Sequence, residues 1–280
     1  MPHSVSTTAF DRLATDYDVI ESRNPIFQWM RRRVQHAALA AFERGGRLLE
    51  VGCGTGTDAL FFARRGHRVV ALDPSAAMLE VAREKIALAG FSHIADFRQS
   101  GAEHLHEVIA NYGKASFDGI FSNFGALNCV ADLRQFARDT AILLRPGGKM
   151  LLNIMPPICP WEVFYYLFKL KPVEALRRWR GRNGARGLPV NLGNRQVQTY
   201  YHSAAAVAKN FLPAVEIEKQ LALGLLLPPP YLSVVRRNQK IFNVLLNGEK
   251  ILADWPLLRN WGDHVVFILR RKNQLAASAN

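Results

Sequence analysis

The sequence contains little cysteine, and its three cysteines form no recognisable framework. Cys53, Cys129 and Cys159 lie far apart, and none belongs to a Cys-x-x-Cys pair. This pattern excludes a disulfide-stapled scaffold and a cysteine-based metal centre. We interpret all three as reduced and free of metal, which indicates a cytoplasmic location.

Long hydrophobic runs are also missing. The longest apolar stretches, such as residues 221–227, fall well short of the roughly 20 residues that a membrane-spanning helix needs. The N-terminus has no basic segment followed by an apolar run, so we expect no secretory signal. A spanning segment is therefore excluded, whereas a location peripheral to the membrane stays open.

Acidic residues are scarce relative to basic ones, with 23 Asp and Glu against 36 Lys and Arg, and the net charge is +13. The excess concentrates in residues 156–202, which hold eight Lys or Arg and two Glu. Such a region favours an anionic partner, which could be a lipid surface, a nucleic acid or an acidic small molecule. A basic, solvated surface without a partner is the alternative, and both interpretations stay open.

Predicted strands and helices alternate through the first half of the chain. Residues 10–41 have helical periodicity and precede the glycine pair at 45–46. Strands are then predicted at 47–51, 68–72, 95–98, 117–122 and 149–155, and helices at 58–65, 76–89, 103–112 and 133–144, the first of these capped by Thr57. This alternation predicts a parallel sheet covered by helices on both faces.

The regular pattern breaks after residue 155. We expect a basic, aromatic insertion at 156–202, a helix at 203–211, strands at 215–223 and 264–271, and a second, irregular insertion at 224–262. The chain then divides into an N-terminal helical segment (1–45), a core (46–155), the first insertion (156–202), a segment that completes the core (203–272) and a tail (273–280).

A glycine turn follows the first predicted strand. Gly52, Gly54 and Gly56 allow positive φ and let a ligand approach the backbone. Asp73 ends the neighbouring strand, 23 residues after Glu50, where a carboxylate can accept two hydrogen bonds from a ribose diol. The segment therefore predicts a nucleotide-binding half-site.

The spacing of this turn argues against a dinucleotide. The pattern G-x-G-x-x-G would need glycine at position 57, where the chain has threonine. Glu50 places a carboxylate beside the turn, which is unfavourable next to a pyrophosphate and suits an α-amino group. We therefore expect a ligand with a ribose and a positive charge but no phosphates.

The motifs E-V-G-C-G-T-G and A-L-D-P-S resemble those of the class I S-adenosylmethionine-dependent methyltransferases. The resemblance runs from about residue 10 to residue 155 and includes the segments FSNFGALNCV and LLRPGGKMLL. It implies S-adenosylmethionine as the cofactor and no metal. It also implies a Rossmann-like, doubly wound α/β fold with a seven-stranded sheet. That sheet is mostly parallel, with strands 215–223 and 264–271 as a C-terminal antiparallel hairpin, and the insertions form a lid over the acceptor.

The resemblance also implies roles for individual residues. Those that hold the amino-acid end of the cofactor are Glu50, Gly52, Cys53, Gly54 and Gly56. Asp73 binds the ribose, Pro74 and Met78 pack near the adenine, and Gly101 and Ala102 occupy the loop beside the adenine amino group. Asn123 lies beside the departing methyl group, and Tyr17 belongs to an N-terminal helix that covers the cofactor.

The acceptor pocket is expected from residues outside the shared core, which are rich in aromatics. We predict that Trp161, Tyr165, Tyr200 and Tyr231 line it. Trp161, Phe164, Tyr165 and Phe168 recur on one face of a helix, either as the core of the insertion or as an apolar lid. A general base is needed only if the acceptor loses a proton, and Glu162, His202 and His264 are the candidates.

Three functions are compatible with these features. A small-molecule methyltransferase would act on a hydrophobic, or additionally anionic, acceptor such as a prenyl, quinone, polyketide or lipid-like compound. An RNA methyltransferase would use the basic insertion, although Asn123-Phe124-Gly125-Ala126 lacks the N/D-P-P-Y signature of amino-group methylases. A membrane-surface protein, or a lipid methyltransferase at that surface, would attach through residues 161–182, a helical stretch broken at Pro172.

Overall fold

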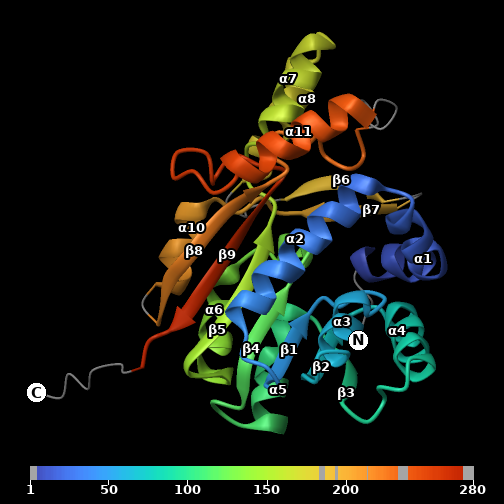
Figure 1. The fold of residues 1–280 in the computed structure, drawn as a ribbon, viewed down its shortest axis with the longest axis vertical. Helices are drawn as coiled ribbons and strands as arrows, with labels where there is room; N and C mark the ends of the chain where they lie inside the picture. Colours follow the sequence, from blue (N-terminus) through green and yellow to red (C-terminus); the bar gives the residue numbers. More distant parts are fainter. Residues whose placement is uncertain (1–4, 183–186, 193–194, 213, 233–238, 274–280) are drawn as a thin grey trace, which may run out of the picture.

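A computed structural model describes residues 5–182, 187–192, 195–212, 214–232 and 239–273. Its centre is a seven-stranded sheet in the order β3-β2-β1-β4-β5-β9-β8 (Figure 1). The strands are β1 (Arg47–Val51), β2 (Arg68–Asp73), β3 (Ala95–Gln99), β4 (Phe117–Ser122), β5 (Leu144–Ile154), β8 (Val215–Leu223) and β9 (His264–Arg271). Strand β9 is antiparallel to both β5 and β8, and the other pairs are parallel. The predicted fold class is confirmed.

Helices cover both faces of the sheet, because the buried strands carry apolar side chains on both sides. Leu48 and Phe121 pack with helices α2 (Pro25–Ala41), α3 (Thr57–Ala63) and α4 (Ala76–Leu88). Leu49 and Ile120, one residue along in each strand, pack with α5 (Leu105–Tyr112), α6 (Leu133–Leu143) and α10 (Ala204–Phe211). The predicted covering of the sheet by helices on both faces is therefore confirmed, with one hydrophobic core on each face.

The strand order reverses between β1 and β4, which are neighbours in the sheet. Chains leaving the carboxyl ends of these two strands turn to opposite faces, so a crevice opens at that edge. The glycine turn after β1 and Asn123 after β4 both lie there. The topology thus brings together residues that are about seventy positions apart in the sequence.

The N-terminal segment forms two helices, α1 (Val5–Ser22) and α2, and the prediction of one helical run over 10–41 was wrong. Asn24 separates them and caps α2, since its Oδ1 accepts from the backbone N–H of Ile26 at 3.1 Å. Its Nδ2 donates to the carbonyl of Pro230 at 2.9 Å. Pro25, at the first position of α2, cannot continue the hydrogen-bonding pattern of α1.

The first insertion contains helices α7 (Pro160–Phe168), α8 (Pro172–Ala175) and α9 (Arg177–Arg180). It also contains a hairpin of β6 (Leu188–Leu192) and β7 (Arg195–Thr199), which the sequence did not predict. Helices α7 and α8 project beyond one end of the sheet (Figure 1). The predicted break at Pro172 is confirmed.

The second insertion is more regular than expected, because α11 (Gln239–Leu252) lies within residues 224–262. Glu249 on this helix accepts hydrogen bonds from the backbone N–H groups of residues 224–227. The predicted tail from residue 274 onward lies outside the described residues. No described helix is both long and apolar enough to cross a bilayer.

We predict that Asn24→Ala lowers the free energy of unfolding by about 1–2 kcal/mol, because it removes the cap of α2. Asn24→Ser keeps the capping oxygen and loses the bond to Pro230, so it should recover most of that stability. Urea unfolding followed by circular dichroism measures both. Equal losses in the two variants would show that the bond to Pro230, and not the cap, carries the effect.

Candidate active site

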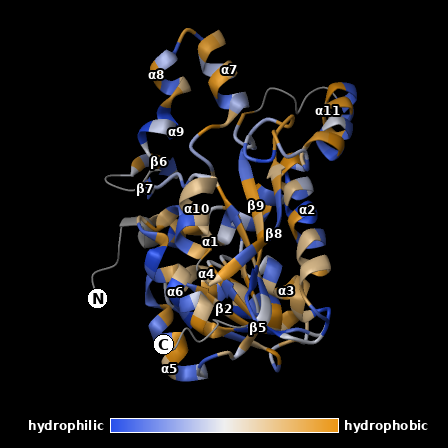
Figure 2. Ribbon diagram, turned by 90° about the vertical axis from the view of Figure 1, so that its left-hand side faces the viewer, coloured by the Kyte–Doolittle hydropathy of each residue, from blue (hydrophilic) through white to orange (hydrophobic). Residues whose placement is uncertain are grey.

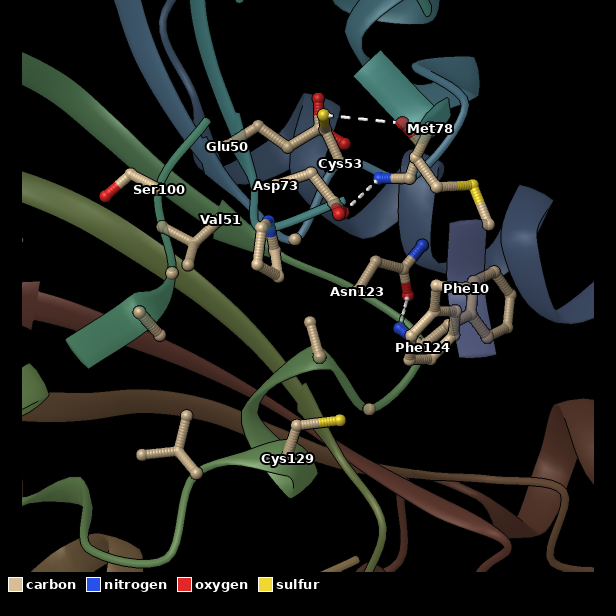
Figure 3. Close-up of a pocket in the computed structure, with 18 of the residues that line it drawn as sticks. Phe10, Glu50, Val51, Cys53, Asp73, Met78, Ser100, Asn123, Phe124 and Cys129 are labelled. Atoms are coloured by element: carbon tan, nitrogen blue, oxygen red, sulfur yellow. Dashed lines mark hydrogen bonds between the residues drawn. The ribbon is translucent and has the colours of Figure 1, made fainter. Parts of the chain in front are cut away.

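A cavity of about 1170 Å³ opens at the carboxyl ends of the parallel strands (Figure 3). Eleven of the twelve residues predicted to bind a cofactor line it, namely Tyr17, Glu50, Gly52, Cys53, Gly54, Asp73, Pro74, Met78, Gly101, Ala102 and Asn123. Gly56 does not line it. That glycine is the N-cap of α3 at φ 73°, so the prediction of Thr57 as the cap was wrong.

The turn after β1 is shaped by close backbone contacts. Gly52 has φ 76°, and a Cβ at this position would lie 2.2 Å from the Cβ of Ala126. Gly54 has φ 52°, and no atom lies within 4 Å of the place where its Cβ would be. The first glycine is therefore required by packing within the protein, and the second leaves open space beside the backbone for a ligand.

Asp73, the last residue of β2, is tied to this turn. Its Oδ2 accepts from the backbone N–H of Gly54 and its Oδ1 from that of Ser75, each at 2.9 Å. Burial raises the pKa of this carboxyl to about 6, against the opposing effect of the two hydrogen bonds. Each carboxylate oxygen can accept a second hydrogen bond, so the group can also receive ligand hydroxyls.

Glu50 lies within β1, and only 2% of it is exposed. Its Oε2 has no hydrogen-bond partner among the described residues. Burial, and then the charge of Asp58, raise the pKa of this carboxyl well above its ordinary value. A buried carboxyl with an unpaired oxygen fits a ligand that brings a positive charge, such as the ammonium group of an amino acid.

A polar cluster that the sequence analysis missed faces the same region. Asp58, on α3, forms an ion pair with Arg31 of α2. It also accepts from Gln35 Nε2 at 2.7 Å and from Asn123 Nδ2 at 3.0 Å. Asn153 Nδ2 in turn donates to Asn123 Oδ1 at 2.7 Å, which fixes the amide beside the cavity. No spacing in the sequence marks Arg31, because it is one of three consecutive arginines.

The far half of the cavity is largely apolar. It is lined by residues from α1, from the loop after β4 and from β7, including Phe10, Phe124, Cys129, Val130, Gln196, Gln198 and Tyr200. Figure 3 shows Phe10 and Phe124 on the side away from Glu50. The Phe124 ring lies 4.4 Å from that of Phe27 and 4.7 Å below the guanidinium of Arg31. Burial raises the pKa of the Cys129 thiol to about 12, so this thiol is neutral.

Of the four residues predicted for an acceptor pocket, Tyr200 alone is among those that line the described cavity. Asn128 holds it there, donating from Nδ2 to the Tyr200 carbonyl at 2.6 Å. Trp161 donates to the carbonyl of Leu226, Tyr165 packs edge-on against Tyr166, and Tyr231 accepts from Arg177. The structure does not bring these three to the cavity.

The aromatic stripe on α7 is not the core of the insertion, because 70% of Phe164 and 87% of Phe168 are exposed. Nor does any of its four residues line the cavity as a lid. The helix predicted from the apolar periodicity is confirmed, but two of the four residues on its apolar face point to solvent.

The three candidate bases also lie away from the cavity lining. Glu162 is buried between Arg177 and Arg178, and Arg178 reaches Asp263 Oδ1 at 2.6 Å. His264 Nδ1 lies 3.1 Å from Asp263 Oδ2, so these groups form one buried network. His202 bonds through Nε2 to the carbonyl of Val130 at 2.9 Å, and burial lowers its pKa. These contacts account for all three residues as parts of the framework.

In the part of the chain that the structure describes, no group of three or more His, Cys, Asp or Glu is arranged to hold a metal ion. The charged side chains that line the cavity are mainly carboxylates, with Arg31 as their counter-charge. The site therefore offers hydrogen-bond acceptors and negative charge at one end and aromatic surface at the other.

Comparisons with known proteins find similarity to methyltransferases. Residues 48–148 match the family model of a methyltransferase domain. A demethylmenaquinone methyltransferase from Symbiobacterium thermophilum is 28% identical over 175 residues, which cover 61% of this chain and 67% of that protein. A ubiquinone biosynthesis O-methyltransferase from Methylocella silvestris is 38% identical over 106 residues, which cover 38% of each chain. The chain thus matches well under half the length of this second relative.

A solved structure shares the fold over nearly the whole chain. It is the 1,6-didemethyltoxoflavin-N1-methyltransferase of Burkholderia thailandensis, which contains 1,6-didemethyltoxoflavin and S-adenosylhomocysteine. The TM-score is 0.53 at 16% identity, and the match covers 96% of this chain and 88% of that one. At this identity the likeness concerns the fold.

We predict that Glu162→Gln lowers the free energy of unfolding by about 3–5 kcal/mol, because it leaves the buried Arg178 with one carboxylate in place of two. Chemical denaturation measures the loss. Glu174→Gln, on the exposed surface of α8, is the matched control and should change stability by less than about 0.5 kcal/mol. Similar values for the two variants would contradict a framework role for Glu162.

Proposed function

We propose that the chain is a class I S-adenosylmethionine-dependent methyltransferase and that it methylates a hydrophobic small molecule bound in the aromatic half of the cavity. The observation that carries the proposal is the division of one cavity into an acidic end and an aromatic end. Its volume of about 1170 Å³ exceeds the range of about 300–1,000 Å³ that is typical for a single ligand. The cavity can therefore hold the cofactor and an acceptor together.

The acidic end fits S-adenosylmethionine, the cofactor of this family. We assign Glu50 to the ammonium group of the cofactor, because one of its carboxylate oxygens is unpaired among the described residues. We assign Asp73 to the ribose hydroxyls, because each of its oxygens accepts one hydrogen bond and can accept another. Pro74, Met78 and the loop at 100–103 line the place for the adenine. When bound, the cofactor supplies a methyl group already activated by a sulfonium, which transfers by in-line displacement.

The protein contributes positioning and exclusion of water. Asn123 is held from two sides by Asp58 and Asn153, so its amide has a fixed orientation at the junction of the two halves. Phe124, the next residue, has φ 47°, which is uncommon for a phenylalanine, and its N–H donates to Asn123 Oδ1 at 2.9 Å. This backbone conformation places the Phe124 ring against the acceptor half.

The aromatic end supports a planar, apolar acceptor of the quinone type. Phe10, Phe124 and Tyr200 offer ring surfaces, and Gln196 and Gln198 offer amides that could orient a ring oxygen. The two relatives carry names that refer to demethylmenaquinone and ubiquinone, which fits this chemistry. The carboxylates of the cavity favour a neutral acceptor and give no support to an anionic one.

The RNA alternative receives less support from the cavity. None of the described basic residues of the first insertion lines it, and Arg31 is already paired with Glu21 and Asp58. A polyanion would meet negative charge at the cofactor end. The observations therefore favour a small, apolar acceptor over a nucleic acid.

We predict that affinity for S-adenosylhomocysteine falls about tenfold between about pH 7 and about pH 5 because Asp73, with a pKa of about 6, becomes protonated. The ionised carboxylate accepts both ribose hydroxyls and the protonated one does not, so binding weakens as pH falls. Calorimetry at constant ionic strength measures this.

Asp73→Asn should remove this component of the pH dependence and weaken binding at pH 7. Asp254→Asn, at an exposed position outside the cavity lining, should reproduce the wild-type profile. A wild-type profile in the Asp73 variant would remove Asp73 from the cofactor site.

We predict that the purified protein converts S-adenosylmethionine to S-adenosylhomocysteine when a short-chain demethylated quinol is added, with the methyl group found on the quinol by mass spectrometry. Phe124→Ala should raise KM for the quinol about tenfold, as expected for a lost aromatic contact, and leave affinity for S-adenosylhomocysteine within about twofold. Phe164→Ala, which removes an exposed ring outside the cavity, is the control. Methyl transfer to RNA in place of the quinol would overturn the proposed acceptor class.

A further inference from the structure

We propose that the connection between α7 and α8 is a docking site for an anionic lipid surface. This α7–α8 tip consists of Phe168, Lys169, Leu170 and Lys171, where apolar and cationic side chains alternate. It lies at the end of the projection that Figure 2 shows above the sheet. Docking at this tip would bind the protein to a lipid surface whatever the acceptor of the methyl group is.

The apolar residues of the tip contribute almost nothing to the core of the protein. Phe168 is 87% exposed and Leu170 is 89% exposed. Further apolar side chains on the same projection, Phe164, Leu167, Val173, Leu176 and Trp179, are also exposed. Single exposed apolar residues are common, but a contiguous group of this kind marks an interaction surface.

The backbone at Leu170 gives a second, independent observation. Helix α7 ends in a Schellman motif, because Lys171 N donates to the carbonyl of Tyr166 at 2.8 Å and Leu170 N to that of Leu167 at 2.9 Å. The left-handed position of this motif, usually glycine, is occupied by Leu170 at φ 56°. A leucine in this left-handed conformation is strained, and the burial of its side chain does not offset the strain, because Leu170 is almost fully exposed. Its side chain therefore serves a contact outside the chain.

The charges identify that contact as an anionic surface. Lys169, Lys171, Arg180 and Arg182 are exposed on this projection, against the single exposed carboxylate of Glu174. Among the described residues, none of the four cations forms an ion pair with a carboxylate. Lysines beside apolar side chains suit a bilayer interface, where phosphates meet acyl chains. A protein partner would need shape complementarity, which four residues on a narrow tip cannot provide.

The base of the projection is rigid, so the tip is presented in a fixed position. Glu162, near the start of α7, and Arg178, on α9, are both buried and paired with each other. Arg178 is also bonded to Asp263, which adjoins the last strand of the sheet. The projection is thus fastened to the core at one end and exposed at the other, as an insertion into a surface requires.

The test is co-sedimentation of the purified full chain with vesicles of phosphatidylcholine containing about one third phosphatidylglycerol, and with vesicles of phosphatidylcholine alone. The wild type should bind the anionic vesicles. Lys169→Gln combined with Lys171→Gln should lower the partition coefficient about 30-fold, because each lysine near such a surface contributes about fivefold. Lys114→Gln combined with Lys209→Gln, at two exposed lysines elsewhere, makes the same change in net charge and should have little effect.

Leu170→Gly separates binding from folding. Glycine relieves the left-handed strain, so this variant should unfold at the same or a higher temperature than the wild type, and its vesicle binding should fall about tenfold. Leu88→Ala, at another exposed leucine, is the matched control and should bind as the wild type does.

Three results would overturn the proposal. The first is wild-type binding by the Leu170 variant, and the second is an equal loss in the two lysine pairs, which would mean attraction by net charge alone. The third is failure of the wild type to bind the anionic vesicles. If that wild type also sediments as a dimer and Leu170→Gly makes it monomeric, the occupant of the tip is a second copy of the chain. Binding of S-adenosylhomocysteine by every variant shows that the core is intact, whatever the outcome for vesicles.

Discussion

The bond between the Asp73 carboxylate and the Gly54 N–H is the contact on which the rest of the site depends. It ties the end of β2 to the turn after β1, and the Gly52 and Cys53 N–H groups add bonds to the Leu72 carbonyl at 2.8 and 2.9 Å. The neighbouring strand therefore holds the backbone of the turn, and Thr55 of the turn adds a side-chain bond to Asp18 at 2.6 Å. Because both partners are at the carboxyl edge of the sheet, the parallel topology itself creates the acidic end of the cavity.

Burial then sets the electrostatics of that end. Glu50, Asp58 and Asp73 are all nearly inaccessible to solvent, and Arg31 is shared between Asp58 and Glu21. The excess of buried carboxylates is costly without a ligand, as the raised pKa values of Glu50 and Asp73 show. A ligand that brings an ammonium group and hydroxyl donors relieves this cost, whereas a pyrophosphate would increase it. The burial that raises the pKa of these carboxyls thus also selects the chemistry of their ligand.

The sequence predicted those parts of the molecule that depend on local signals. The strands ending at Val51 and Asp73 and the glycine turn follow from apolar runs and from residues that allow positive φ. The adjacency of Glu50 and Asp73 follows from the edge that parallel strands share. The sequence did not predict the contacts that depend on tertiary structure. Nothing in the sequence marks the bond from Asn24 to Pro230, the pairing of β6 with β7, or the selection of Arg31 from three consecutive arginines.

The aromatic insertion shows why residue type alone could not separate a pocket from a surface. Tyr200 and Phe168 are both aromatic residues outside the shared core, yet one lines the cavity and the other faces solvent. The difference lies in what fastens each segment. Asn128, fully buried, binds the backbone at Tyr200 and at Met155 and so holds the end of the hairpin against β5. The Glu162–Arg178–Asp263 network fastens the start of α7 to the core, whereas Phe164 and Phe168 further along that helix are exposed in the part of the chain that the structure describes. Their apolar side chains are therefore available to a partner outside the chain.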